Sequence, residues 1–289
     1  MDGPKTRPRA TVALVRFRRA FRTADNLRKV DSFSEIVRVN AAGYQLVHYG
    51  AGRPVILYPS LGRAGNDFDR LAQGLARSGY HAIAVNPPGV ATPLGEPAWT
   101  DLSDIAADLW AIIDQAQLDR VVLVGHAFGN RVVRATSAAR ADDVDALVLL
   151  ACGGDVAPGP EVFPNFFNCF NEQLDRETHS RSVQAAFFAP GNEPGEWTEG
   201  WYPELAKCQR EAVAATDFEE FGMGGTAPGL IVQGLDDVIA PPQNAWNLVA
   251  RRPDTRVVGL PDCGHAMLPE QPTAILDAVV SFLAEKLPG

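Results

Sequence analysis

The sequence predicts an α/β fold in which a mostly parallel, doubly wound sheet carries helices on both faces. Three observations support this fold class. Short apolar runs rich in β-branched residues alternate with amphipathic helical segments from residue 55 to residue 150. The same alternation resumes at residue 229. Between these stretches, residues 153–225 contain helical segments and no good strand, so we expect a helical insertion to interrupt one sheet.

Each predicted element follows from its hydrophobic period. Strands are predicted where apolar residues alternate or form short buried runs: 35–40, 44–49, 55–58, 81–85, 121–124, 146–150, 229–234 and 255–260. Helices are predicted where apolar residues recur every three or four positions: 67–78, from the expected N-cap Thr100 onward, 131–139, from about Asn244 onward, and 273–286. The insertion is expected to hold helices near 161–171, 177–188 and 201–216.

The most informative stretch joins the strand at 121–124 to the helix at 131–139. Gly125 and Gly129 flank the turn between them, and glycine lacks a Cβ, so strand and helix can approach closely around one central residue. This shape is typical of a nucleophile elbow, whose central residue is held on a strained backbone and attacks the substrate. Here the central residue is Ala127, whose methyl group cannot attack anything.

Composition excludes several function classes. A net charge of −9 argues against a general nucleic-acid partner. No apolar run approaches the ~20 residues that a membrane span needs. The four cysteines lie far apart without metal-type spacing, which favours reduced thiols in a cytoplasmic protein. No Gly-x-Gly-x-x-Gly follows the first strand and no ligand cluster is visible, so neither a metal nor an organic cofactor is expected.

The N-terminal residues 1–30 differ in charge from the rest of the chain. They carry a net charge of +7, with nine Lys and Arg against Asp2 and Asp25. We interpret them as a basic, solvated and partly helical arm, although an arm that docks on an acidic surface or an anion would have the same composition.

Three motifs, each at the end of a predicted strand, resemble those of the α/β-hydrolase family. Gly125-His126-Ala127-Phe128-Gly129 is similar to the Gly-x-Ser-x-Gly elbow, and Gly234-Leu235-Asp236-Asp237 is similar to the loop that carries the acid. Gly264-His265 is similar to the loop that carries the catalytic histidine. The chain order nucleophile, acid, histidine is also that of the family, and the resemblance covers essentially all of the chain after residue 30.

The resemblance implies a division of the chain and roles for single residues. Beyond the basic arm over 1–30, it implies an α/β-hydrolase core over 31–152 and 226–289, and a helical cap over 153–225, inserted after the sixth predicted strand. His265 would be the catalytic base, with Asp237 to orient it; the neighbouring Asp236 is the competitor for that place. The backbone N–H groups of Leu61 and Phe128 would form the oxyanion hole. His265 and Asp237 would make up a catalytic dyad facing that hole.

The insertion contains eleven aromatic residues, which fit two roles. They can form the insertion's own small core, or they can line a pocket for an apolar or aromatic ligand between cap and sheet. For the second role we expect Phe166, Phe167, Phe187 and Trp201 to bind substrate, together with Ser60 on the oxyanion side. The expected partner is thus a small apolar or aromatic substrate, and the sequence leaves a homodimer open.

Ala127 has three explanations, which the sequence does not separate. In the first, Ala127 replaces the serine of a hydrolase for an ester, lactone or related acyl bond. Alternatively, a natural serine-less enzyme uses the dyad as a general base, as lyases, cyclases or cofactor-free oxygenases do. Thirdly, the protein is a non-catalytic ligand binder, against which the retention of both Asp237 and His265 weighs. We therefore expect an enzyme of the hydrolase superfamily.

Overall fold

The fold is described from a computed structural model, which places residues 12–17, 30–93, 95 and 99–288. Nine strands form one sheet in the order β1-β2-β3-β5-β4-β6-β7-β8-β9. The strands are β1 (Val12–Phe17), β2 (Ser32–Val39), β3 (Ala42–Tyr49), β4 (Arg53–Tyr58), β5 (Tyr80–Asn86), β6 (Val121–His126), β7 (Val144–Leu150), β8 (Gly229–Gly234) and β9 (Arg256–Leu260). Strands β4 to β9 pair in parallel, and β1, β2 and β3 add antiparallel pairs at one edge. The predicted mostly parallel sheet is confirmed.

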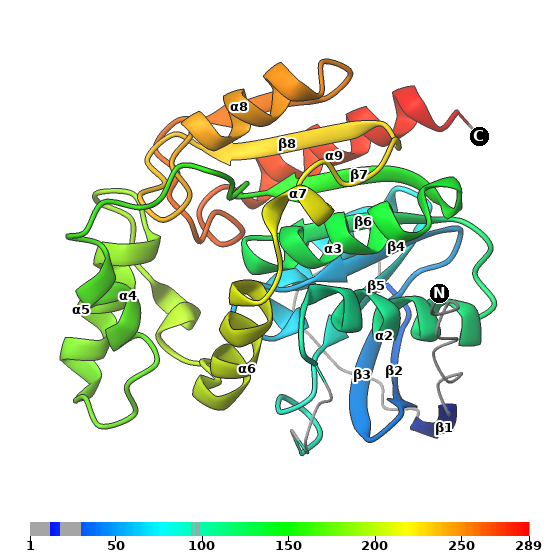
Figure 1. Cartoon of the computed structure of the whole chain (residues 1–289), viewed down its shortest axis with the longest axis horizontal. Coiled ribbons are helices and arrows are strands. Elements are labelled where there is room, and N and C mark those ends of the chain that lie inside the picture. The colour runs from blue at the N-terminus through cyan, green and yellow to red at the C-terminus, as the bar shows by residue number, and fades with distance from the viewer. Residues whose placement is uncertain (1–11, 18–29, 94, 96–98, 289) are drawn as a thin grey trace, which may run out of the picture.

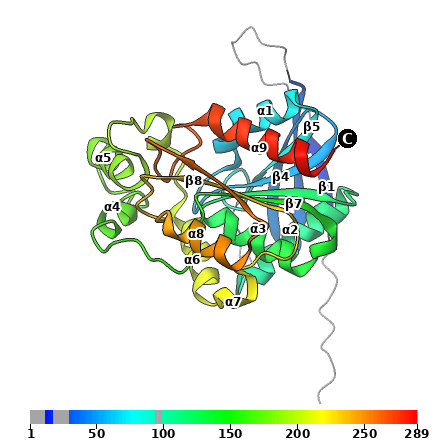
Figure 2. The ribbon, with the colours of Figure 1, turned by 90° about the horizontal axis from the view of Figure 1, so that it is seen from above.

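Helices cover both faces of this sheet (Figure 2). One face carries α1 (Asp69–Arg77) and α9 (Pro272–Lys286), and the other carries α2 (Leu102–Gln115), α3 (Phe128–Ala139) and α8 (Gln243–Arg251). Each face has its own apolar core: Leu71 and Phe282 belong to the first, and Leu109 and Val132 to the second. The central strands are buried on both faces, which explains why they are continuous apolar runs rather than alternating ones.

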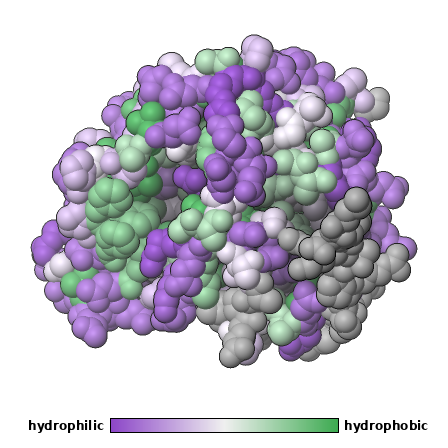
Figure 3. All heavy atoms as spheres, viewed as in Figure 1, coloured by the Kyte–Doolittle hydropathy of each residue, from purple (hydrophilic) through white to green (hydrophobic). Residues whose placement is uncertain are grey.

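The helical segment between β7 and β8 extends the fold beyond one end of the sheet (Figure 1). It contains α4 (Phe163–Asn168), α5 (Arg176–Phe187), α6 (Pro203–Ala214) and α7 (Phe218–Phe221). The first three lie beyond the end toward which the arrow of β8 points, whereas α7 lies beside α3. Space-filling atoms show an apolar area over this segment (Figure 3), and the side chains of Phe163 and Phe167 are exposed there. Among the described residues, none of the helices combines the length and the apolar character that crossing a membrane requires.

Arg63 ties this segment to the sheet. It lies in the loop after β4, and the Cζ atom of its guanidinium lies 4.2 and 4.7 Å from the ring centroids of Trp197 and Trp201. Its Nη1 donates to the carbonyl of Glu199 at 2.6 Å, and its Nη2 pairs with the buried carboxylate of Asp67 at 2.6 Å. Because both charges are buried and paired, neither can be removed alone without leaving the other uncompensated.

Three local expectations need correction. Strand β1 pairs antiparallel with β2 inside the segment expected to be a partly helical arm, and the remaining arm residues lie outside the described ones. In the sequence its short apolar run is flanked by arginines, and fourteen residues separate it from β2. With β1 counted, the helical segment follows the seventh strand rather than the sixth. Finally, Asp101 and not Thr100 caps α2, because the Asp101 carboxylate accepts N–H groups from Ser103 and Asp104.

Candidate active site

Ala127 forms the tip of the turn between β6 and α3. Its backbone has φ 53° and ψ −109°, a conformation that residues with a Cβ rarely adopt. The turn is fixed on both sides, because the Ala127 N–H donates to the carbonyl of Leu150 at 2.9 Å and its carbonyl accepts from Asn130 at 3.1 Å. Such a conformation costs of order 1–3 kcal/mol and persists only where its surroundings enforce it.

The two glycines of the turn permit this geometry. A Cβ on Gly129 would overlap the carbonyl oxygen of Tyr58 on β4, and a Cβ on Gly125 would overlap the backbone of Gly129. Strand, helix and neighbouring strand therefore meet at distances that only glycine allows, as the spacing in the sequence indicates.

Asp237 and His265 come from the loops after β8 and β9, and the structure brings them together. The Nδ1 atom of His265 lies 2.9 and 3.0 Å from the two carboxylate oxygens of Asp237. The carboxylate also accepts the backbone N–H groups of Ile239 at 3.0 Å and Ala240 at 2.7 Å, so it is held in one orientation. Asp236, the alternative partner, is exposed. Because Nδ1 faces a carboxylate, the neutral His265 ring carries its proton on Nδ1, and Nε2 presents a lone pair.

His126 holds the backbone of His265, a link that the sequence did not indicate. Its Nε2 lies 2.8 Å from the His265 carbonyl oxygen, to which it donates, and its Nδ1 has no hydrogen-bond partner within the described part of the chain. Burial, with a smaller contribution from the neighbouring His265, lowers the pKa of His126 to about 3. The ring is therefore neutral at physiological pH.

A cavity of about 390 Å³ opens between these loops and the helical segment. Of the residues that we expected in the site, seven line it: Ser60, Leu61, Ala127, Phe128, Phe166, Phe187 and His265. No acceptor within the described residues takes the N–H groups of Leu61 and Phe128, the two groups expected to form an oxyanion hole. Asp237 lies behind His265, where it is 3% exposed. The cavity that contains Ala127 is thus lined by the His265 imidazole and by the two residues whose N–H groups are available.

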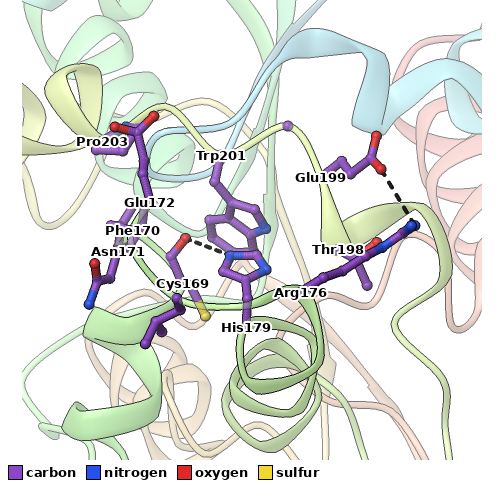
Figure 4. Close-up of a pocket in the computed structure, with 12 residues that line it drawn as sticks. Cys169, Phe170, Asn171, Glu172, Arg176, His179, Thr198, Glu199, Trp201 and Pro203 are labelled. Atoms are coloured by element: carbon purple, nitrogen blue, oxygen red, sulfur yellow. Dashed lines mark hydrogen bonds and ion pairs between the residues drawn. The ribbon is translucent and has the colours of Figure 1, made fainter.

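The structure places the other two expected substrate-binding residues elsewhere. Phe167 does not line this cavity and is 52% exposed. Trp201 packs against Arg63 and Phe187 and borders a second pocket of about 440 Å³ on the helical segment (Figure 4). In the same pocket, Nε2 of His179 lies 3.0 Å from the carbonyl oxygen of Cys169. Trp201 thus serves the packing role that the aromatic cluster also allowed, whereas Phe167 lies at the surface.

Two charged residues of the cavity were missed at the level of sequence: Arg131 on α3 and Arg210 on α6. Arg131 follows Ala127 by four positions, so helical periodicity alone could have placed it on the same face as the elbow. Nothing in the sequence near Arg210 points to the cavity, because its position depends on how α6 packs.

Comparison with known proteins identifies the family of the chain. Residues 46–278 match the family model of the alpha/beta hydrolase family, so the chain belongs to that family. It is 26% identical to a putative carbamate hydrolase, RutD, of Klebsiella pneumoniae, over 74% of this chain and 85% of the relative. It is also 26% identical to the esterase YbfF of Escherichia coli, over 62% of this chain and 73% of the relative.

Solved structures show the same fold. A serine hydrolase from Cycloclasticus zankles, a bacterium that degrades polyaromatic hydrocarbons, superposes with a TM-score of 0.73 at 16% identity, over 90% of this chain and all of that one. The chain is thus a member of the alpha/beta hydrolase family, and its relatives include proteins named as a putative carbamate hydrolase and an esterase.

Proposed function

We propose that this protein is an enzyme that acts on a small-to-medium apolar carbonyl or ester-type substrate through a dyad of His265 and Asp237. One observation carries the proposal: the Nδ1 atom of His265 lies 2.9 Å from a buried carboxylate while the same ring borders the cavity that contains Ala127. A non-catalytic ligand binder would have no use for a buried carboxylate that orients an imidazole.

The chemistry follows from the protonation states. Nε2 of His265 takes a proton from a water molecule or from the substrate itself, and the Asp237 carboxylate stabilises the imidazolium that forms. The N–H groups of Leu61 and Phe128 bind the oxygen on which negative charge develops. General-base catalysis supplies typically 10²–10⁴-fold, which suits a substrate that is already activated. Cleavage, elimination, cyclisation and addition of oxygen all begin with such a proton transfer, so a lyase, a cyclase or a cofactor-free oxygenase is the alternative to hydrolysis.

A second candidate is a serine hydrolase in which Ala127 occupies the place of the nucleophile. The strained backbone at Ala127, with φ 53°, favours it, because a position without a nucleophile gains nothing from that strain. In both candidates residues 153–225 act as a cap over the core formed by 31–152 and 226–289, which agrees with the position of Phe166 and Phe187 in the wall of the cavity.

Hydrolysis of 4-nitrophenyl butyrate by four variants tests both candidates. General-base catalysis predicts that the unmodified chain hydrolyses this activated ester and that H265A lowers the rate by about 10²-fold or more. The serine-hydrolase candidate predicts that A127S hydrolyses it far faster, and that the matched variant A127S/H265A loses the gain.

Each outcome decides between the candidates. Equal rates for the unmodified chain and H265A would exclude the dyad from the chemistry of the chain as it stands. A failure of A127S to exceed the unmodified rate would count against the serine-hydrolase candidate. If neither substitution changes the rate while butyrate esters still bind, the protein is a ligand binder.

A further inference from the structure

The catalytic cavity is electrically unbalanced. Its lining within the described residues includes three groups that can carry positive charge, Arg131, Arg210 and His265, and no aspartate or glutamate. The remaining wall is mostly apolar, formed by side chains such as Val162, Phe166, Phe187, Val213 and Ile239. A neutral, purely apolar substrate gives no reason for two guanidinium groups in such a wall.

Arg131 lacks the partners that a neighbouring arginine has. Its guanidinium makes neither a hydrogen bond nor an ion pair with any residue that the structure describes. Arg134 lies one turn further along α3, is fully buried, and donates to Asn130, Gly222 and Gly153 through four hydrogen bonds. Arg134 is thus satisfied by the protein, whereas Arg131 presents unused donors to the cavity.

Burial makes the unpaired state of Arg131 costly. Burial, together with the smaller effect of the charge of Arg134, lowers the pKa of Arg131 to about 10, so the group remains protonated at neutral pH. Arg210 is in a similar position: its Nη1 is buried without a hydrogen-bond partner in the described chain, and its guanidinium lies 5.9 and 5.8 Å from the rings of Phe167 and Phe170. Buried cations without a partner are unfavourable until an anion pairs with them.

The two arginines line the cavity from different parts of the fold. Arg131 belongs to α3 of the core, one helical turn from Ala127, and Arg210 belongs to α6 of the helical segment. An anion between them would bridge the core and the segment that covers the cavity. The rest of a substrate that carries this anion would lie along the apolar wall, toward Ala127 and His265. Guanidinium groups match carboxylates in planarity and donor spacing.

We propose that the substrate carries a carboxylate, bound by Arg131 and Arg210, at the end remote from the carbonyl that reacts beside Ala127 and His265. The second half of this statement rests on the proposed function, whereas the carboxylate site stands on the two arginines alone. Monoesters of short dicarboxylic acids have this chemistry.

Binding to the unmodified protein tests the carboxylate site without any reaction. Monomethyl glutarate and methyl valerate have the same chain length and differ only in the terminal carboxylate. By isothermal titration calorimetry we expect monomethyl glutarate to bind at least 10-fold more tightly. R131M, which keeps an unbranched stem but removes the guanidinium and its charge, should weaken that binding by about 10- to 100-fold, the effect of a lost charge-assisted hydrogen bond. R210M should weaken it as well, and R131K should recover part of the loss.

The matched control is R176M. The side chain of Arg176 is 85% exposed on α5 and faces Glu199, away from this cavity, so its removal should leave the affinity for monomethyl glutarate unchanged. Melting curves by circular dichroism establish that each variant is folded. Equal affinities for the two esters, or an R131M variant that binds monomethyl glutarate as the unmodified chain does, would overturn the proposal.

A kinetic experiment separates this inference from the proposed function. In the A127S background, kcat/KM is measured for mono-4-nitrophenyl glutarate and for 4-nitrophenyl valerate, and R131M is expected to lower their ratio by about 10-fold or more, mainly through KM. If A127S hydrolyses both esters with a ratio that R131M does not change, the carboxylate site is wrong and the hydrolase remains. If A127S hydrolyses neither ester but the calorimetric preference depends on Arg131, the carboxylate site stands and the hydrolytic function fails.

Discussion

His126 makes the stability of this protein depend on pH in a defined direction. The ring is completely buried, and burial lowers its pKa to about 3, whereas an unfolded chain exposes a histidine with its ordinary pKa of about 6.5. Below pH 6.5 the unfolded state therefore binds a proton that the folded state does not bind. The contribution of His126 to stability is complete above pH 6.5 and falls as the pH decreases toward about 3.

The size of the effect follows from the two pKa values. Between pH 7.5 and pH 5.0 the folded protein should lose about 2 kcal/mol of unfolding free energy through His126 alone. The variant H126Q cannot titrate in this range and retains an amide that can donate to the His265 carbonyl as Nε2 of His126 does. The loss between the two pH values should therefore be about 2 kcal/mol smaller in H126Q than in the unmodified protein.

Urea unfolding at pH 7.5 and pH 5.0, followed by circular dichroism, measures these four free energies. H179Q is the matched control, because His179 lies at the surface pocket of α5 and bonds to a carbonyl of its own segment. It should show the same loss with pH as the unmodified protein. If H126Q loses as much stability between the two pH values as the unmodified protein does, burial of a neutral His126 is refuted.

Two further substitutions probe contacts that position the site. R63M should lower the unfolding free energy by about 3–5 kcal/mol because it leaves the buried Asp67 carboxylate unpaired, and R63M/D67L should recover much of this, as measured by urea unfolding. Full stability of R63M would contradict a tie between the loop after β4 and the helical segment. G129A should lower the unfolding free energy by roughly 3 kcal/mol or more, because the added Cβ overlaps the carbonyl of Tyr58. In the control G153A the added Cβ makes only ordinary van der Waals contacts. Similar melting temperatures for the two variants would refute the close approach at Gly129.

Much of the framework was available in the sequence because it depends on local rules. Hydrophobic period distinguishes buried strands from helices, and glycines at 125 and 129 mark a turn that only a close strand–helix approach requires. The order of elbow, acid and histidine motifs placed Asp237 and His265 at neighbouring strand ends, where the structure joins them at 2.9 Å. Local signals were weaker where pairing is distant in sequence, as for β1, or where two adjacent residues compete for one cap, as at Thr100 and Asp101.

The sequence by itself determined the sheet, its helices, and the meeting of an imidazole with a carboxylate opposite Ala127, because strand ends of a parallel sheet must share one edge. Only the tertiary structure decided which aromatic residues face the cavity. Phe166 and Phe187 do so, whereas Phe167 is exposed and Trp201 stacks on Arg63. The same holds for the meeting of arginines from α3 and α6 in one apolar wall. The physical reason is that the direction of a side chain on a short helix depends on how that helix rotates and packs, and packing depends on residues far away in the chain.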